Sequence, residues 1–288
     1  MQVVHVTAVS VALRDNDAIA SCEHLLDLIN SYVDMSSRWD VPRAARYGLL
    51  HLLQHFDRQS PSLTPHQLAC AVEIAASRGH LSILEWVHTH PRDREAFTVK
   101  TMNMAAFHGH LDIVQWLHTN RSEGCTTKAM DGAACCGHLD VVRWLHENRF
   151  EGCTLDAMDS AAVNGHLDVV HYLHFHRAEG CTTRAMDVAA ANADMPMLAF
   201  LQKHRSEGCT LSAVKNAASG CRFHLLGANQ SVQVLQWLYD HYPTLFSPPV
   251  LNMCLRLGPV EVAAWIQSLG IVDEELFSTW LMALGPIT

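Results

Sequence analysis

Residues 126–153 read TTKAMDGAACCGHLDVVRWLHENRFEGC, and the same pattern recurs along most of the chain. The tripeptide Gly-Cys-Thr begins at residues 124, 152, 180 and 208, so each occurrence follows the last by 28 residues. An Ala-Ala pair recurs with its first alanine at 44, 75, 105, 133, 161, 189 and 217, and an eighth unit places Trp265 28 residues after Trp237. Eight units in phase predict a repeat architecture, in which each unit stacks on its neighbours.

Each unit contains the signals of two short helices. Met130, Ala133 and Ala134 recur at three- and four-residue spacing, which predicts a first helix with one apolar face. Gly137 suits the left-handed residue that ends a helix. A second helix is then predicted from residue 139, with Asp140 in its first turn, where a negative charge suits the helix dipole.

The loops between units predict helix caps. The segment ENRFEGCTT returns the chain, and Thr126 and Thr154 can each cap the first helix that follows. Two such helices cannot bury their apolar faces alone, so neighbouring units must stack. The small Ala-Ala step allows close approach, and we expect the aromatic residue eleven positions after it (Trp144 in this unit) to fill the seam. Below, the repeat template means the positions that keep one residue type from unit to unit.

The core Ala-Ala-x-x-Gly-His-Leu-Asp-Val-Val resembles an ankyrin repeat, and the resemblance covers roughly residues 41–270. The unit of 28 residues is shorter than the ankyrin repeat of about 33. The missing residues fall where ankyrin repeats project a β-hairpin finger, so a short Arg-x-Glu-Gly-Cys-Thr loop is expected instead. The unit is similar to ankyrin families expanded in oomycete genomes. The resemblance implies an all-α, ankyrin-like helical-hairpin solenoid with about eight repeats and helical caps.

The repeat pattern divides the chain into three parts. Residues 1–40 are expected to form an arm and a capping helix, and residues 41–270 the repeat array. An insertion at about 219–230 interrupts the seventh unit. Residues 271–288 are expected to form a second capping helix, because Gly285-Pro286 follows an apolar helical pattern.

Composition restricts the classes of partner. The net charge is −9, with 29 acidic and 20 basic residues, which disfavours nucleic acid and anionic membranes. No stretch approaches the roughly 18 apolar residues of a spanning helix, and the start lacks a basic region typical of a signal peptide. We therefore expect a monomer in the cytoplasm or nucleus. The ten cysteines are expected to be reduced thiols.

Histidine and cysteine raise the question of a metal site. His166, His171, His174 and His176 form the densest cluster among twenty histidines. Most histidines, however, recur with the repeat, which indicates capping or packing, and they lack a fixed four-ligand spacing. We therefore predict no metal site.

The cysteines are expected to be structural. Cys125, Cys153, Cys181 and Cys209 form a column with one member per repeat, and the spacing of stacked helices predicts that the column is unbridged and buried. Cys135 and Cys136 are adjacent and expected to point in different directions on a helix.

Charged residues recur in the loops, where an arginine stands two residues before a glutamate. The four pairs begin at Arg121, Arg149, Arg177 and Arg205. These pairs can form a ladder that ties successive loops together, or the arginines can bind a phosphate or an acidic partner. The equal number of glutamates in the same loops favours the ladder. Catalytic motifs such as a nucleophile elbow or a phosphate-binding loop are absent, so we predict neither an enzyme nor a cofactor.

Positions that vary while the template stays fixed are the candidates for binding. In ankyrin folds the positions around the Ala-Ala pair line or border the concave surface, so the resemblance implies a partner-binding patch there. The alternative for any single residue is neutral drift at the surface. In the insertion, apolar residues in a surface loop either bind or fold back over the next repeat. The predicted partner-binding residues are Met104, Phe107, His108, Cys136, Ser160, Asn164, Asn192, Phe223 and Leu225.

These features predict a scaffold or adaptor that holds another protein on its concave face. A substrate receptor of a ubiquitin ligase is the first alternative, because the helix HLLDLINSYVD vaguely resembles part of an F-box, although a cap explains it better. A metal-binding protein that uses histidine and cysteine is the second.

Overall fold

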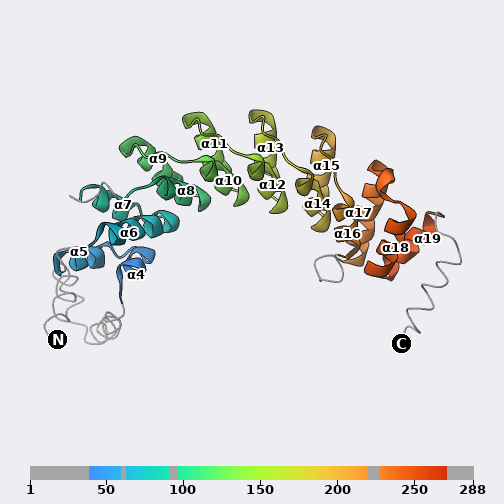
Figure 1. The fold of residues 1–288 in the computed structure, drawn as a ribbon, viewed down its shortest axis with the longest axis horizontal. Coiled ribbons are helices and arrows are strands. Elements are labelled where there is room, and N and C mark those ends of the chain that lie inside the picture. Colours follow the sequence, from blue (N-terminus) through green and yellow to red (C-terminus); the bar gives the residue numbers. More distant parts are fainter. Residues whose placement is uncertain (1–38, 60–62, 91–95, 220–226, 271–288) are drawn as a thin grey trace, which may run out of the picture. The chain divides into compact units, whose positions relative to one another are not determined.

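The computed structural model describes residues 39–59, 63–90, 96–219 and 227–270, which are all-helical and contain no strand. Sixteen α-helices in this part of the chain form eight helical hairpins (Figure 1). The helices are α4 Val41–Arg46, α5 Leu50–Gln59, α6 Pro65–Arg78, α7 Leu81–His88, α8 Val99–Phe107, α9 Leu111–Asn120, α10 Thr127–Cys135, α11 Leu139–Asn148, α12 Leu155–Val163, α13 Leu167–His176, α14 Thr183–Ala191, α15 Met195–His204, α16 Leu211–Ser219, α17 Ala228–His241, α18 Pro248–Leu257 and α19 Val260–Ser268, with a 3-10 turn at Pro243–Leu245. The two predicted capping helices lie outside the described residues.

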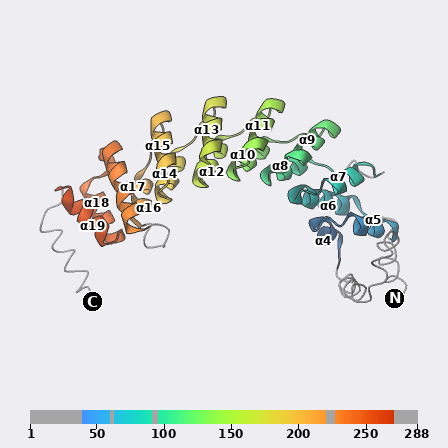
Figure 2. The same cartoon turned by 180° about the vertical axis from the view of Figure 1, so that it is seen from behind.

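The chain divides into two compact units, residues 1–101 and residues 102–288. In the first unit, α4 packs against α6, and α6 packs against α7. In the second, the first helices α10, α12, α14 and α16 contact one another in order and form one layer. The second helices α11 and α13 also contact each other, and the second helices form the other layer (Figures 1 and 2).

Small residues allow the first helices to approach. Every Ala-Ala pair of the template is buried, and Ala133 and Ala134 have no exposed surface. Met130 fills the space beside them and is 2% exposed. On the second helix, Val141 and Val142 are fully buried. The core is therefore a continuous apolar seam between the two layers, as expected for units that cannot bury their apolar faces alone.

The predicted helix ends are confirmed. Thr126 Oγ1 accepts a hydrogen bond from the backbone N–H of Lys128, and Thr154 caps the next first helix in the same way. Gly137 adopts a φ of 77°, and Asp140 lies in the first turn of α11. The segment between α11 and α12 contains bend and loop residues and no strand. It is the short loop that the sequence predicts in place of a β-hairpin finger.

The seventh hairpin accommodates part of its insertion by lengthening a helix. Helix α17 has 14 residues, whereas α11, α13 and α15 have 10 each. The extra residues begin at Ala228, with Gly227 as the N-cap. Residues 220–226 lie outside the described residues.

Candidate protein-binding surface

The most exposed apolar side chains of the predicted patch lie on α8. Met104 is 37% exposed and Phe107 is 40% exposed. The ring of Phe107 lies against Gly132 in the next repeat, where an added Cβ would be 3.0 Å from Phe107 Cδ2. The exposed ring of His108 meets the Phe107 ring edge-on, with centroids 5.1 Å apart. These three side chains thus form a small apolar and aromatic surface on the first-helix layer.

The structure places the predicted asparagines in contacts between repeats. Asn164 Nδ2 donates to the carbonyl oxygen of Cys135 at 2.9 Å. Asn192 Nδ2 donates to the carbonyl oxygen of Val163 at 3.0 Å in the same way. Each side chain therefore satisfies a carbonyl at the end of the preceding first helix, which gives these asparagines a structural use that the sequence comparison did not reveal.

The remaining predicted residues are less exposed or are not described. Cys136 is the half-buried C-cap of α10, and Ser160 is half-buried on α12. Phe223 and Leu225 lie outside the described residues. The structure therefore brings Met104, Phe107 and His108 together, and Cys136 belongs to the adjoining repeat.

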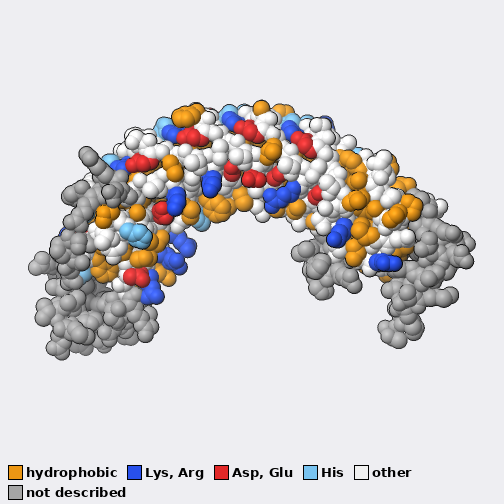
Figure 3. Space-filling model, in the orientation of Figure 1, with side chains coloured by type: hydrophobic (Ala, Val, Ile, Leu, Met, Phe, Trp, Pro, Cys, Tyr) orange, Lys and Arg blue, Asp and Glu red, His pale blue; other side chains and the backbone are white. Residues whose placement is uncertain are grey.

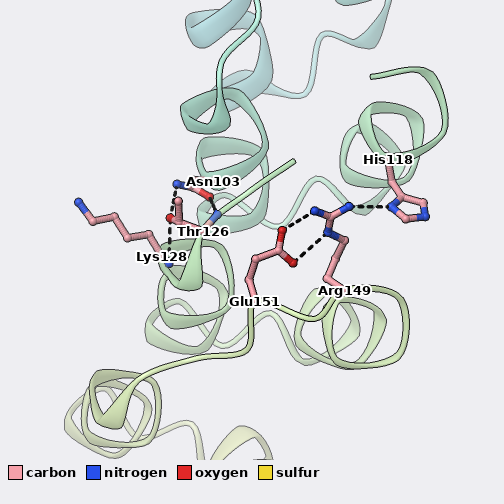
Figure 4. Close-up of polar contacts among 6 residues, drawn as sticks. All are labelled: Asn103, His118, Thr126, Lys128, Arg149 and Glu151. Carbon is pink, nitrogen blue, oxygen red and sulfur yellow. Dashed lines mark hydrogen bonds and ion pairs between the residues drawn. The ribbon is translucent and has the colours of Figure 1, made fainter. Parts of the chain in front are cut away.

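A polar ladder joins the first helix of each repeat to the loop that follows it. The backbone N–H of Thr154 donates to Asp131 Oδ1 at 2.7 Å, and Thr154 Oγ1 donates to Asp131 Oδ2 at 3.1 Å. In the preceding repeat Asn103 replaces the aspartate. The backbone N–H of Thr126 donates to Asn103 Oδ1 at 3.0 Å, and Asn103 Nδ2 donates to Thr126 Oγ1 at 2.9 Å (Figure 4). Burial raises the pKa of the Asp131 carboxyl, although the bonds from Thr154 oppose the shift.

The arginine–glutamate ion pairs form within single loops, and the pair of Arg149 and Glu151 also contacts the loop of the preceding repeat at Gly124 and Cys125. Arg149 Nε donates to Glu151 Oε2 at 3.1 Å, and its Nη2 donates to the other carboxylate oxygen (Figure 4). The same guanidinium reaches the preceding repeat, because an added Cβ at Gly124 would be 2.7 Å from Nη2. Figure 3 shows basic and acidic side chains adjoining each other on this face. The arginines thus already have partners.

The repeated histidines pack against neighbouring repeats. The rings of His138 and His166 cover the glycines that end the preceding first helices, Gly109 and Gly137. Both histidines are N-caps that make no side-chain capping bond. On the second helices, His118 meets Trp144 edge-on with centroids 5.2 Å apart, and the same contact recurs for later histidines. These residues are therefore packing elements of the fold.

Two histidines of the densest group, His171 and His174, lie in an aromatic cluster. His171 lies 4.7 Å from Phe175 and 5.5 Å from Phe200, measured between ring centroids, and His174 contacts both phenylalanines. His204 adjoins His174 at 5.2 Å. Within the described residues, no group of three or more His, Cys, Asp or Glu side chains could hold a metal ion.

The cysteine column is unbridged, as predicted. Cys125, Cys153 and Cys181 are buried and free, and Cys209 is half-buried and free. Burial raises the pKa of the Cys125 thiol to about 11, so it stays protonated at neutral pH and reacts poorly as a nucleophile.

Three exposed aromatic residues of the described chain are absent from the predicted patch, and one of them, Tyr47 at the end of α4, is 64% exposed. Phe150 is 91% exposed in the loop after α11, and Phe175 is 56% exposed on α13. The signal was present in the copies, because Ser122, Ala178 and Ser206 occupy the position of Phe150 in the other loops.

Comparison with known proteins agrees with this geometry. A family model described as ankyrin repeats (3 copies) matches residues 102–187, which include α10 to α13 and the patch on α8. Among curated proteins, none matches the chain. In the described residues, no helix is long and apolar enough to span a membrane. With matched repeats, stacked helical hairpins and the template of small residues between them, residues 102–187 are an array of ankyrin repeats.

Proposed function

We propose that the chain is a scaffold or adaptor whose partner protein binds the first-helix layer at Met104, Phe107 and His108. Ankyrin repeats generally mediate protein–protein interaction and are typically non-enzymatic. The observation that carries the proposal is the partial exposure of Met104 and Phe107 at positions where the template requires no apolar residue. Aromatic residues in such places are frequent anchors of interfaces.

The local structure supports a preformed surface. Phe107 is held between Gly132 and His108, so its ring loses little freedom when a partner covers it. Gly132 leaves room for this ring, because a side chain at this position would meet it. In later repeats Ser160 and Val188 occupy the corresponding position. The partner class is a protein with an apolar contact region, and the expected compartment is the cytoplasm or nucleus. No observation favours the ligase alternative, whose helix lies in residues 1–38, outside the described part of the chain.

The test compares wild-type protein with Phe107→Glu and with a matched control, Thr119→Glu, which places the same charge on the exposed face of α9. Each immobilised protein is incubated with cell lysate, and retained proteins are quantified by mass spectrometry. The dissociation constant of each purified partner is then measured. Loss of an interface anchor costs about 2 kcal/mol or more, so Phe107→Glu should weaken binding roughly 30-fold.

The two variants separate the possible outcomes. Equal weakening by Phe107→Glu and Thr119→Glu would reflect net charge and contradict the proposed site. Equal retention by all three proteins would place the contact elsewhere, and Phe150→Ser would then test the loop. Retention of no protein by wild type would contradict the scaffold function. Circular dichroism of each variant verifies that the repeats are folded.

A further inference from the structure

Two adjacent cysteines occupy the end of one first helix. Cys135 is the last residue of α10, and Cys136 is its C-cap with φ −97° and ψ 3°. The corresponding pairs in neighbouring repeats are Phe107-His108, Val163-Asn164 and Ala191-Asn192. The template therefore requires no cysteine at either position, and packing alone does not explain this pair.

The turn that carries the pair is well fixed. The backbone N–H of Cys136 donates to the carbonyl of Gly132 at 3.2 Å. Asn164 from the next repeat donates through Nδ2 to the carbonyl oxygen of Cys135 at 2.9 Å and lies 3.3 Å from its sulfur. An amide donor directed at a sulfur stabilises negative charge there, as outer hydrogen bonds do for metal-bound thiolates.

The two thiols are more accessible than three of the four members of the cysteine column. Both are half-buried and free, whereas Cys125, Cys153 and Cys181 are buried. The pKa of Cys136 is raised by burial and then by its interaction with the Cys135 thiol. The pair is thus an accessible dithiol.

A direct disulfide fits this position poorly. Consecutive Cα atoms are about 3.8 Å apart across a trans peptide, whereas disulfides join Cα atoms about 4.4–6.8 Å apart. A bridging atom removes this constraint, because two metal–sulfur bonds of about 2.3 Å allow the sulfurs to be as much as roughly 4.6 Å apart. A bridged dithiol is therefore the favoured product of this pair.

We propose that Cys135 and Cys136 bind one soft, thiophilic cation of the Cu(I) type between their sulfur atoms. Thiolates are the ligands that select such ions. Both thiols lose their protons, two sulfur–metal bonds form, and two protons go to solvent, with no change of oxidation state. Because no third His, Cys, Asp or Glu side chain of the described residues completes a site here, coordination by the chain is through two sulfurs.

The test uses Cu(I) under anaerobic conditions, in competition with a chromogenic Cu(I) chelator. A Cys22→Ser/Cys221→Ser background removes the two thiols that lie outside the described residues. In this background we expect one equivalent of Cu(I) to resist the chelator. Cys135→Val and Cys136→Asn copy residues of the neighbouring repeats, so each should fold normally and lose this equivalent. Asn164→Ala should weaken binding by about 10-fold.

Cys70→Ser is the matched control, because Cys70 is another half-buried free thiol of the described chain. It should leave the affinity unchanged. The proposal is overturned if the background protein binds no more tightly than the Cys135→Val/Cys136→Asn variant, or if Cys70→Ser removes the ion equally. A phenylarsenical that blocks Cu(I) binding and is released by a dithiol but not by a monothiol would support the same pair independently. Release by a monothiol would contradict it.

Discussion

Ala193 adopts a φ of 51° at the position where Gly165 has a φ of 78° one repeat earlier. Both residues follow a first helix, and the backbone N–H of each donates to a carbonyl three residues back at 3.2 Å. Among the described residues, Ala193 is the non-glycine residue with positive φ. An L-residue in this left-handed conformation costs about 1–2 kcal/mol, so the repeat ending at Ala193 is less favourable than its neighbours.

We expect Ala193→Gly to raise the free energy of unfolding by about 0.5–1 kcal/mol, because the relief of strain exceeds the added entropy of the unfolded chain. Urea denaturation followed by circular dichroism measures the change. Ala199→Gly, on the exposed face of α15, is the control and should lower stability by about 0.5–1 kcal/mol. A loss of stability in both variants would contradict the strain at Ala193.

Two glycines with the same conformation should respond differently to alanine. Gly137 and Gly165 have φ values of 77° and 78°. An added Cβ at Gly137 would be 2.6 Å from Nδ1 of His166, whereas at Gly165 the nearest atom is Oδ2 of Asp194 at 3.7 Å. Gly165→Ala should therefore cost only the backbone strain of about 1–2 kcal/mol, and Gly137→Ala should cost more.

A double-mutant cycle identifies the source of the difference. If the His166 ring causes the extra cost, Gly137→Ala should destabilise a His166→Ala protein no more than Gly165→Ala destabilises wild type. Urea denaturation of the four proteins gives the coupling free energy. A coupling of zero would show that the ring does not cause the extra cost.

The elements that could be predicted from sequence depend on neighbours close in the chain. The cap at Thr126 and the left-handed turn at Gly137 are set within a few residues of each position, so one copy of the repeat suffices to predict them. The bond from Thr154 to Asp131 spans 23 residues, and the bond from Asn164 to Cys135 spans 29. Such contacts depend on how repeats stack, so the sequence does not reveal that Asn164 binds the preceding repeat.

Asp131→Asn should be neutral or stabilising at pH 7, by up to about 1 kcal/mol. Asn103 makes both bonds to its threonine in the preceding repeat, so an asparagine can replace the aspartate without losing them. Because the folded-state pKa of Asp131 is raised, wild type gains stability as pH falls through that pKa toward the unfolded value near 3.8. The advantage of Asp131→Asn should thus be largest at neutral pH and shrink in acid.

Urea denaturation of Asp131→Asn at pH 7 and pH 4 measures both effects. Asp131→Ala is the control, since it removes both bonds to Thr154 and should destabilise the protein at either pH. An advantage of Asp131→Asn that grows as pH falls would show that the charge of Asp131 stabilises the repeat, contrary to the raised pKa.

His174 should make stability depend on pH near neutrality. Its Nδ1 is buried, and among the described residues it has no hydrogen-bond partner. Burial lowers the pKa of this imidazole, with further lowering from Arg205, His204 and His171 that exceeds the opposing effect of Glu207. A group whose folded pKa is depressed contributes stability above its unfolded pKa, near 6.5, and loses it as pH falls through the folded pKa.

Gln202 occupies the corresponding position one repeat later, so His174→Gln is a substitution that the fold accommodates. We expect the variant to lose less stability than wild type between pH 7 and pH 5, by up to about 1 kcal/mol, because glutamine does not titrate. Thermal denaturation across this range measures the difference. Ala199→Gln, which adds a glutamine on α15 and removes no histidine, should follow the wild-type profile. If His174→Gln follows that profile as well, protonation of His174 does not contribute to the loss of stability in acid.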